Sequence, residues 1–516
     1  MRDDCELVTE IHLPPAAAAS PAVLMRTPYS RTLFGVEIAP LVAAGYAVVV
    51  QSVRGRHGSE GSFVPYLAEG EDGYDTVEWV ASQQWCDGQV AMIGASYGGW
   101  TQWAAARERP PSLKTLISSV CCASWTKEWP WADGVLWQGA ISWLHMVAGS
   151  EDHDLTDMDP TQPYWPLRDF QRRYGRSLTQ AQDWLEHPRP DDYWAPITLS
   201  AKDFAGMDLP VLHITGWFDG CQRGAQFLYE GMRTHSPAAH KQALLVGAWD
   251  HTVREMKRTY DGVDFGPHSV LGYHQERIAW LNAHLRDRGA PASAVRAFIT
   301  GTNRWTTLPD LPHPDTSSRH WHLGGDGRLG EHPTDETRSY VYDPCDPTPT
   351  RSAADASYPL LIRNTIHERE DVLTWDGELL ESAITLVGVA RVQVHFSASV
   401  PDTDLFAELV DIAPDGTRVL VAHGRLRVRY RHADEAMLIP GELAHAAIEM
   451  VCRVHQFAPG HRLGLAIMSS GAPLWAPHPN QGGDLLDASE PTSATITIHS
   501  ESTLTLPTLP ATTLRP

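Results

Sequence analysis

One serine in this chain stands in a pattern that activates serine hydroxyls. Ser96 is the centre of Gly94-Ala-Ser-Tyr-Gly98, which follows a short apolar run at residues 90–93 and precedes a helix-compatible segment at residues 100–108. A strand, a sharp turn and a helix are the context of a nucleophile elbow, in which the two glycines relieve crowding around the serine. The five-residue pattern alone is equally typical of a glycine-rich turn with an incidental serine. The flanking strand and helix favour the catalytic interpretation.

A nucleophilic serine needs a base within hydrogen-bond reach, and the base needs an orienting acid. Two later residues follow predicted strands in the order acid, then histidine, that this type of elbow uses. Asp219 comes just after the run at residues 211–216, and His251 comes just after residues 244–247. Asp250 competes as the acid, and we rank it lower because neighbours in an extended segment point in opposite directions. Asp219 also precedes a glycine, and Asp-Gly is a common pair in turns, so the alternative interpretation of Asp219 is a turn residue without a catalytic role.

Acyl transfer further needs two donors where negative charge develops on the substrate oxygen. The backbone N–H of Tyr97, directly after the nucleophile, is one candidate. The hydroxyl of Tyr29, in Arg26-Thr-Pro-Tyr29 after an early strand, is the other. The alternative for Tyr29 is an ordinary core tyrosine.

The elements that must position these residues alternate along the first part of the chain. Apolar–polar alternation at residues 7–13 predicts an edge strand, and apolar runs predict further strands at residues 22–25, 46–51, 90–93, 113–120, 210–216 and 242–247. Helical periodicity lies between them at residues 38–44, 71–83, 100–108, 222–234 and 273–288. Such alternation indicates an α/β fold with a mostly parallel sheet.

Two segments depart from this alternation. Residues 121–209 are rich in Trp, Asp and Pro and predict a helical cap inserted into the α/β domain, which would comprise residues 1–120 and 210–290. After about residue 291 short strands separated by turn signals follow one another, starting at residues 295–300. This pattern of short strands and turns predicts a C-terminal all-β domain of jelly-roll type over residues 291–516.

Composition restricts the partners. The 516 residues carry a formal net charge of −22, which argues against nucleic acid or an anionic membrane surface as the partner. Seven irregularly spaced cysteines without a C-x-x-C pair predict neither a disulfide framework nor a metal site. The polar start of the chain and the lack of a long apolar run predict a cytoplasmic protein. We expect no cofactor. The sequence does not determine the oligomeric state, and a homodimer is compatible with it.

Segments spread over nearly the whole chain carry a family resemblance. They include Arg26-Thr-Pro-Tyr29, Gln51-Ser-Val-Arg-Gly55, Gly94-Ala-Ser-Tyr-Gly-Gly99, Gly216-Trp-Phe-Asp-Gly220, Gly247-Ala-Trp-Asp-His251, Asp402-Thr-Asp404 and Arg427-Val-Arg-Tyr-Arg431. As a set they resemble the cocaine esterase/X-Pro dipeptidyl-peptidase family of serine hydrolases. The resemblance implies an α/β-hydrolase domain, a helical cap and a C-terminal jelly roll. It implies a triad of Ser96, Asp219 and His251, with the Tyr29 hydroxyl and the Tyr97 N–H as oxyanion donors.

The branches of this family differ in substrate. The X-Pro dipeptidyl peptidases carry an extra N-terminal helical domain, whereas this chain starts almost at the first strand. The α-amino-acid ester hydrolases hold a substrate ammonium with acids partly behind the triad aspartate, and here no acid follows Asp219 before Glu230. We expect an apolar or aromatic substrate group instead. The pocket expected for it comprises Trp125, Trp129, Trp137, Trp217, Phe218, Trp249 and Phe406.

The sequence therefore predicts a serine esterase that hydrolyses a small-molecule ester or amide through an acyl-enzyme on Ser96. An acyltransferase or cyclase would use the same acyl-enzyme, and a dipeptidyl-peptidase-like amide hydrolase is a further alternative. Outside the enzymes, the alternative is a non-catalytic protein that binds ligands through its β-sandwich. The ordered triad argues against this alternative.

Overall fold

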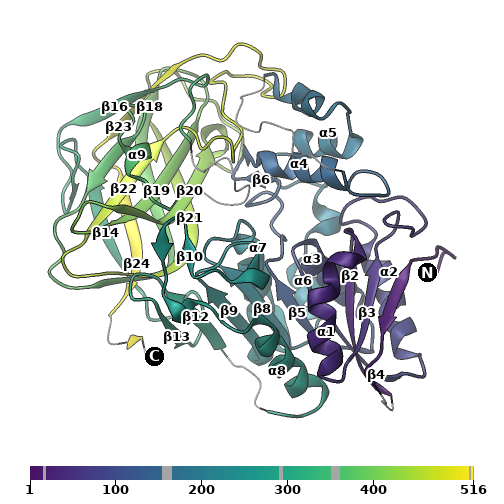
Figure 1. The fold of residues 1–516 in the computed structure, drawn as a ribbon. Helices are drawn as coiled ribbons and strands as arrows, with labels where there is room; N and C mark the ends of the chain where they lie inside the picture. The colour runs from purple at the N-terminus through teal and green to yellow at the C-terminus, as the bar shows by residue number, and fades with distance from the viewer. Residues whose placement is uncertain (16–18, 154–164, 290–293, 350–360, 511–512, 515–516) are drawn as a thin grey trace.

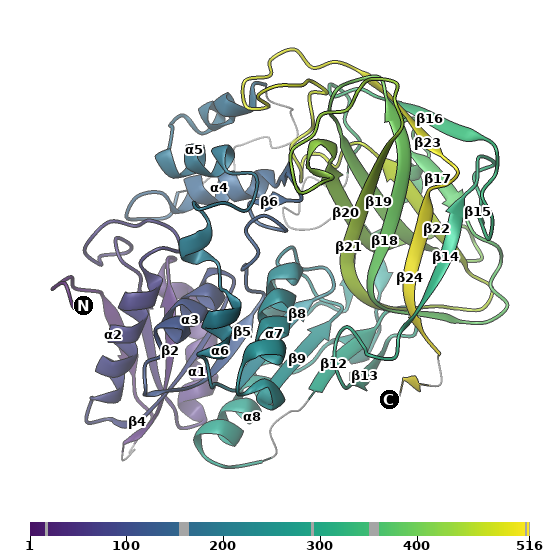
Figure 2. The same cartoon turned by 180° about the vertical axis from the view of Figure 1, so that it is seen from behind.

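The computed structural model describes residues 1–15, 19–153, 165–289, 294–349, 361–510 and 513–514. The chain forms a nine-stranded sheet with helices on both faces, a cap above it and a β-sandwich beside it (Figures 1 and 2). Within the described ranges, no helix combines the length and the apolar character needed to cross a bilayer.

The nine-stranded sheet is parallel except at its two edges. Its order is β1 (Thr9–His12), β3 (Ala47–Ser52), β2 (Ser20–Thr27), β4 (Cys86–Ala95), β5 (Leu113–Ser119), β8 (Val211–Gly216), β9 (Gln242–Gly247), β12 (Ala294–Ile299) and β13 (Arg304–Leu308). The edge strands β1 and β13 pair antiparallel with β3 and β12. The inner strands β2, β3, β8 and β9 are buried along their whole length, as their continuous apolar runs require.

Helices cover both faces of this sheet and create two cores. On one face, α1 (Gly35–Ala43) and α8 (Tyr273–Leu285) pack against alternate strand residues such as Val23 and Met25. On the other face, α2 (Glu69–Ala81), α3 (Tyr97–Glu108) and α7 (Gln222–His235) pack against the intervening residues, such as Leu24. The parallel strands therefore end together at one edge of the sheet, where the loops that follow β4, β8 and β9 meet.

The cap interrupts the chain between β5 and β8. It contains α4 (Gln138–Val147), α5 (Thr179–Glu186), α6 (Ala201–Ala205) and a small hairpin of β6 (Trp131–Ala132) and β7 (Val135–Leu136). The predicted helical cap thus contains α4 and α5 as its longest α-helices. Many cap tryptophans are buried in the same core as α3, so the cap is packed onto the sheet rather than appended to it.

The C-terminal part is the predicted all-β domain. One group of strands comprises β14 (Ser317–Leu323), β15 (Leu329–Gly330), β16 (Thr337–Tyr342), β18 (Ile384–Ala398), β21 (Ala444–Phe457), β23 (Ala494–His499) and β24 (Thr503–Leu509). The other comprises β17 (Leu373–Asp376), β19 (Asp404–Ile412), β20 (Arg418–Arg427) and β22 (Arg462–Met468). The two join where Gly424 of β20 pairs with Met450 of β21, which nearly closes the sheet around its core.

The first strand after the predicted boundary near residue 291 pairs with the α/β sheet and not within the sandwich. The run at residues 295–300, predicted as the first sandwich strand, is β12, which pairs in parallel with β9 and extends the α/β sheet. The antiparallel β13 then forms the edge. An apolar strand has the same sequence pattern in either sheet, so the pattern does not reveal which neighbour it pairs with.

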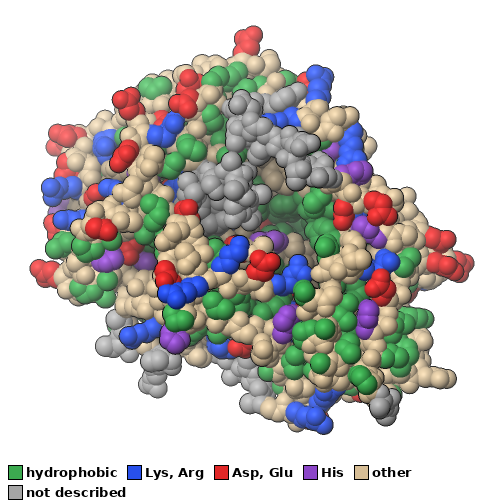
Figure 3. Space-filling view, viewed as in Figure 1, with side chains coloured by type: hydrophobic (Ala, Val, Ile, Leu, Met, Phe, Trp, Pro, Cys, Tyr) green, Lys and Arg blue, Asp and Glu red, His purple; other side chains and the backbone are tan. Residues whose placement is uncertain are grey.

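Charged side chains of both signs are interspersed over the face seen in Figure 3. That face carries no broad basic patch, in keeping with the net charge of −22.

Candidate active site

Ser96 occupies a strained turn between β4 and α3. Its φ of 59° and ψ of −123° lie in a region that side chains rarely adopt. Gly94 is required here, because a Cβ on it would lie 2.5 Å from the carbonyl oxygen of Gly98. Gly98 is not required in the same way, since a Cβ there would make only an ordinary contact of 3.5 Å. The elbow therefore has the expected strand–turn–helix form, but only the first glycine relieves a clash.

The loops after β8 and β9 bring Asp219 and His251 together. Asp219 Oδ1 lies 2.8 Å from His251 Nδ1 and accepts a hydrogen bond from the backbone N–H of Cys221 at 2.9 Å. The other carboxylate oxygen accepts a hydrogen bond from the Thr215 hydroxyl at 2.8 Å. These contacts fix the carboxylate, so it can hold the imidazole with Nδ1 protonated and Nε2 available as the base.

The electrostatics of His251 suit a general base. Burial disfavours the imidazolium, but the charge and hydrogen bond of Asp219 outweigh burial and raise the pKa of His251 above its usual value. Asp250, the competing acid, instead accepts hydrogen bonds from the N–H and hydroxyl of Thr252. The geometry thus pairs His251 with Asp219.

Two donors lie beside Ser96. Tyr97 is the first residue of α3, where N–H groups have no partner within the helix. The Tyr29 hydroxyl interacts with Ser96 and accepts a hydrogen bond from Trp143 Nε1 at 2.8 Å. Burial raises the pKa of Tyr29 to about 12, so its hydroxyl keeps its proton near neutral pH and can donate it to an oxyanion.

A buried polar network supports the elbow from below. The Tyr97 hydroxyl donates to Glu69 Oε1 at 2.7 Å, and Glu69 Oε2 lies 2.8 Å from Arg26 Nη1. Arg26 Nε in turn donates to Gln51 Oε1 at 2.8 Å. Arg26 and Gln51 belong to the motifs quoted from the sequence, and this network gives a physical reason for them. Glu69 was not predicted, because an acid at the start of a helix usually faces solvent.

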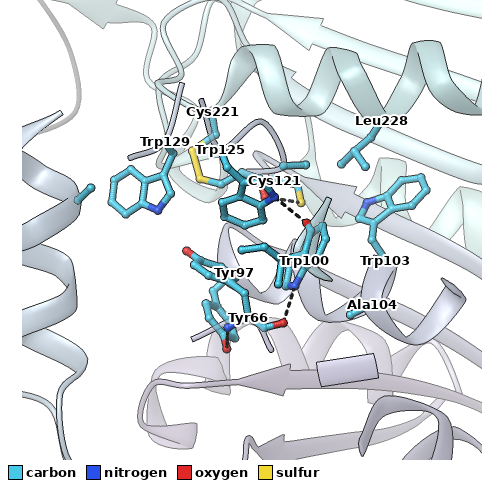
Figure 4. Packing of buried hydrophobic residues seen from close by; sticks show 14 of the residues in the cluster. Tyr66, Tyr97, Trp100, Trp103, Ala104, Cys121, Trp125, Trp129, Cys221 and Leu228 are labelled. Atoms are coloured by element: carbon cyan, nitrogen blue, oxygen red, sulfur yellow. Dashed lines mark hydrogen bonds between the residues drawn. A yellow bond between two sulfur atoms is a disulfide. The ribbon is translucent and has the colours of Figure 1, made fainter. Parts of the chain in front are cut away.

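A cavity of about 220 Å³ opens beside Ser96 and His251. Its walls are aromatic and small side chains, and His251 is the one histidine among the described residues that line it. The full lining is Tyr29, Tyr66, Ser96, Cys122, Trp129, Trp137, Gly139, Trp143, Cys221 and His251. Tyr66 stacks on Tyr97 below the cavity, with ring centroids 4.7 Å apart (Figure 4).

Only two of the seven predicted pocket residues, Trp129 and Trp137, line this cavity. Trp125 lies one layer behind them, packed on Tyr66 with ring centroids 4.6 Å apart. The other four lie in separate environments. Trp217 packs in the core between β8 and the sandwich, Phe218 packs on Phe265, Trp249 packs on Trp305 across the sheet, and Phe406 is buried in β19.

The reason is geometric: sequence proximity to Asp219 or His251 does not decide which face of the loop a side chain occupies. Tyr66 and Trp143 were missed. Tyr66 lies in an irregular loop without a motif, and Trp143 was indistinguishable from the other cap tryptophans.

A disulfide joins Cys122, at the start of the cap, to Cys221, two residues after Asp219 (Figure 4). The sequence did not predict it, because the two cysteines are 99 residues apart and follow no recognisable spacing. Asp219, Cys221 and His251 are the one group in the described part of the chain whose ligand atoms are close enough to hold a metal. Because the Cys221 sulfur is bonded to Cys122, it is not available as a thiolate ligand.

Comparison with known proteins places this geometry in a family. The family model of X-Pro dipeptidyl-peptidase (S15 family) matches residues 3–253, and the model of the X-Pro dipeptidyl-peptidase C-terminal non-catalytic domain matches residues 290–505. Cocaine esterase of Rhodococcus sp. (strain MB1 Bresler) is 30% identical over an alignment of 541 positions, gaps included, which covers 94% of this chain and 92% of that protein.

Solved structures show the same fold over the whole chain. An α-amino acid ester hydrolase has a TM-score of 0.90 and an aminopeptidase from a marine sediment archaeon, Thaumarchaeota archaeon, has 0.89. Each is 23% identical and covers 99% of this chain and 95% of its own. The chain therefore belongs to the cocaine esterase/X-Pro dipeptidyl-peptidase (S15) family of serine hydrolases, which act on esters or peptides.

Proposed function

We propose that this protein is a serine carboxylic-ester hydrolase of the cocaine-esterase type, with Ser96 as its nucleophile. One observation carries the proposal: Ser96, His251 and Tyr29 line the same cavity, and Asp219 holds His251 from behind. A strained serine, a base and an oriented acid meeting at a cavity are the parts that acyl transfer requires.

In the first half-reaction, Ser96 Oγ attacks the ester carbonyl while His251 Nε2 takes its proton. Negative charge develops on the carbonyl oxygen, where the Tyr97 N–H and the Tyr29 hydroxyl donate hydrogen bonds. Asp219 stabilises the imidazolium that forms, and His251 returns the proton to the leaving alcohol. Water, activated by His251, then hydrolyses the acyl-enzyme by the reverse sequence of proton transfers.

The character of the cavity favours a neutral substrate group. No Asp or Glu is among the described residues that line it, so none of these residues would pair with a substrate ammonium. Aromatic walls instead suit a flat or branched apolar acyl or alcohol group. This observation supports an ester with uncharged substituents over a peptide with a free N-terminus. We also propose that the substrate is a small molecule, that neither nucleic acid nor membrane takes part, and that the protein is cytoplasmic. A homodimer is compatible with this proposal.

Two measurements test the proposal together. A fluorophosphonate probe should label the wild-type protein, and p-nitrophenyl esters should be turned over. Ser96→Ala should lose the label and reduce kcat by about 10⁴-fold or more. Ser82→Ala is the matched control, because the Ser82 hydroxyl bonds to Trp79 and Gln83 at the end of α2, away from the cavity, and the variant should behave like wild type. Equal turnover in pure Ser96→Ala would reject Ser96 as nucleophile.

Acyl transfer is the second candidate, since the same acyl-enzyme could pass its acyl group to an alcohol or an amine. Hydrolysis in the presence of rising concentrations of such acceptors distinguishes the two. A hydrolase gives mostly the free acid, whereas a transferase gives mostly the new ester or amide.

A further inference from the structure

A second cavity, of about 30 Å³, lies behind the triad acid where the three parts of the fold meet. The hydrolase domain contributes Gly220 and Arg223, the cap contributes Lys127 and Trp137, and the sandwich contributes Arg425. Trp137 lines both this cavity and the substrate cavity. Its ring is seated on Gly220, where an added Cβ would lie 2.1 Å from the ring, so Trp137 separates the two spaces.

Arg425 is a buried guanidinium without an acidic partner among the residues that the structure describes. Its residue is 6% exposed, and the guanidinium carbon lies 3.7 Å from the ring centroid of Trp475. Its hydrogen bond goes to His423 Nδ1, and its Nε has no partner. Arg427, two residues further along β20, makes the contrast clear because both of its donors bind the Asp404 carboxylate, at 2.9 and 3.0 Å. A buried cation usually has such a counter-ion.

His423 does not supply one. Burial, and next the Arg425 charge, lower the pKa of His423 well below its usual value. The imidazole therefore stays neutral and can accept a hydrogen bond from Arg425 without adding charge. Burial, with the Arg223 charge second, lowers the pKa of Arg425 to about 9, which still leaves it protonated near neutral pH.

The other charges around this cavity also leave a positive excess. Lys127 and Arg223 share one carboxylate, that of Asp133, at 2.6 and 2.7 Å. Glu128 lines the cavity too, but burial raises its pKa to about 8, so it is mostly uncharged at neutral pH. Its oxygens already accept two backbone N–H groups. Three cations, Lys127, Arg223 and Arg425, therefore face two charged acids, Asp133 and the triad residue Asp219, which leaves one positive charge in excess.

We propose that this cavity binds one small monovalent anion of the size of chloride, held by Arg425. A space of this volume takes one or two waters or a halide ion. A water could bridge Arg425 Nε and Gln222 Oε1, which also lacks a partner, but it would leave the charge unbalanced. An anion balances it. Lys127, whose side chain is 58% exposed, gives the anion a route from solvent.

The expected consequence is a tighter junction of the three parts. The anion would lie between α7, which follows the triad acid, the cap segment at residues 127–137 and strand β20. Because Trp137 closes this space from the substrate cavity, the anion is not a substrate group. A ligand that binds only the folded protein raises its thermal midpoint in proportion to the logarithm of its concentration.

The direct test is diffraction from crystals of the full chain grown in sodium bromide. An anomalous peak beside Arg425 is expected in the wild-type protein and not in Arg425→Met, which keeps the packing on Trp475 but removes the charge. In solution, replacing gluconate by about 0.2 M chloride at constant ionic strength should raise the wild-type midpoint by about 3 °C. Arg425→Met should lose this rise.

Arg319→Met is the matched control, because Arg319 is also stacked on a tryptophan, Trp321, but on the exposed face of the sandwich. It should keep the chloride effect. A water in place of bromide in the wild-type crystal would overturn the proposal, and so would a chloride effect that persists in Arg425→Met. The crystal experiment needs only the wild-type protein, so it decides the matter even where Arg425→Met does not fold.

Discussion

Replacing Tyr29 by Phe removes one hydroxyl from the candidate oxyanion site and leaves the aromatic ring in place. The hydroxyl accepts the Trp143 N–H at 2.8 Å, so its own proton is free to point at the substrate oxygen beside Ser96. The backbone N–H of Tyr97 stays as the second donor. The variant therefore isolates one of two hydrogen bonds that strengthen as the oxyanion forms.

The expected size follows from the change in charge during the reaction. Removing one such donor typically lowers kcat by about 10²- to 10³-fold, or about 3–4 kcal/mol of transition-state stabilisation. The substrate carbonyl bonds more weakly to the hydroxyl in the ground state, so KM should change by less than about threefold. The Trp143 N–H loses its acceptor in every state of the enzyme, which costs about 1–3 kcal/mol of folding stability but does not affect kcat.

The assay is steady-state hydrolysis of a p-nitrophenyl ester by wild type, Tyr29→Phe and Tyr46→Phe. Tyr46 is the matched control, because its hydroxyl is also hydrogen-bonded, to Asn282 Oδ1 at 2.9 Å, and burial also raises its pKa to about 12. It lies next to α8, far along the chain from the catalytic loops. We expect the loss in kcat only in Tyr29→Phe. A kcat within twofold of wild type, or a loss confined to KM, would refute the role of Tyr29.

Three further changes test other parts of the site. Asp219→Asn should lower kcat by about 10⁴-fold. It should also move the acidic limb of kcat/KM to lower pH, because the carboxylate charge that most strongly opposes the burial of His251 is then lost; an unmoved limb would contradict the pairing. Gly220→Ala should cost about 1–3 kcal/mol of stability through its clash with Trp137, measured by urea unfolding, whereas Gly35→Ala, with no atom within 4 Å, should cost nothing. His213 is buried with its pKa lowered from 6.5 to about 4, so only the unfolded chain takes up its proton between these values. Wild type should therefore lose about 2 kcal/mol relative to His213→Gln between pH 7 and pH 5, and parallel stability curves would refute this assignment.

Much of this site could be predicted because its parts follow from local sequence rules. Ser96, Asp219 and His251 each come at the carboxyl end of an apolar strand, and parallel strands end at the same edge of a sheet. Order along the chain and position after a strand were enough to select His251 from 25 histidines. The same reasoning gave the α/β domain, the cap and the all-β domain.

The predictions that were wrong concern residues whose position depends on packing between distant segments. Trp249 follows β9 as closely as His251 does, yet it crosses to the opposite face of the sheet and donates to the Ser269 carbonyl. The disulfide and the pairing of strand β12 could not be predicted for the same reason. Each is defined by a partner far away in the sequence, and no local periodicity reports that partner.

The division of the substrate cavity suggests how members of one family can differ in substrate while keeping one chemistry. The serine, the histidine and Tyr29 come from loops of the α/β sheet, whereas Trp129, Trp137, Gly139 and Trp143 all come from the cap. None of the cavity-lining residues comes from the sandwich portion that the structure describes. Phe406, which lies in strand β19 of the sandwich, is therefore not part of the cavity. Substitutions within residues 129–143 should therefore change which ester is preferred. They should move the pH at which His251 loses its proton less than Asp219→Asn does, because the charge and hydrogen bond of Asp219 stay in place.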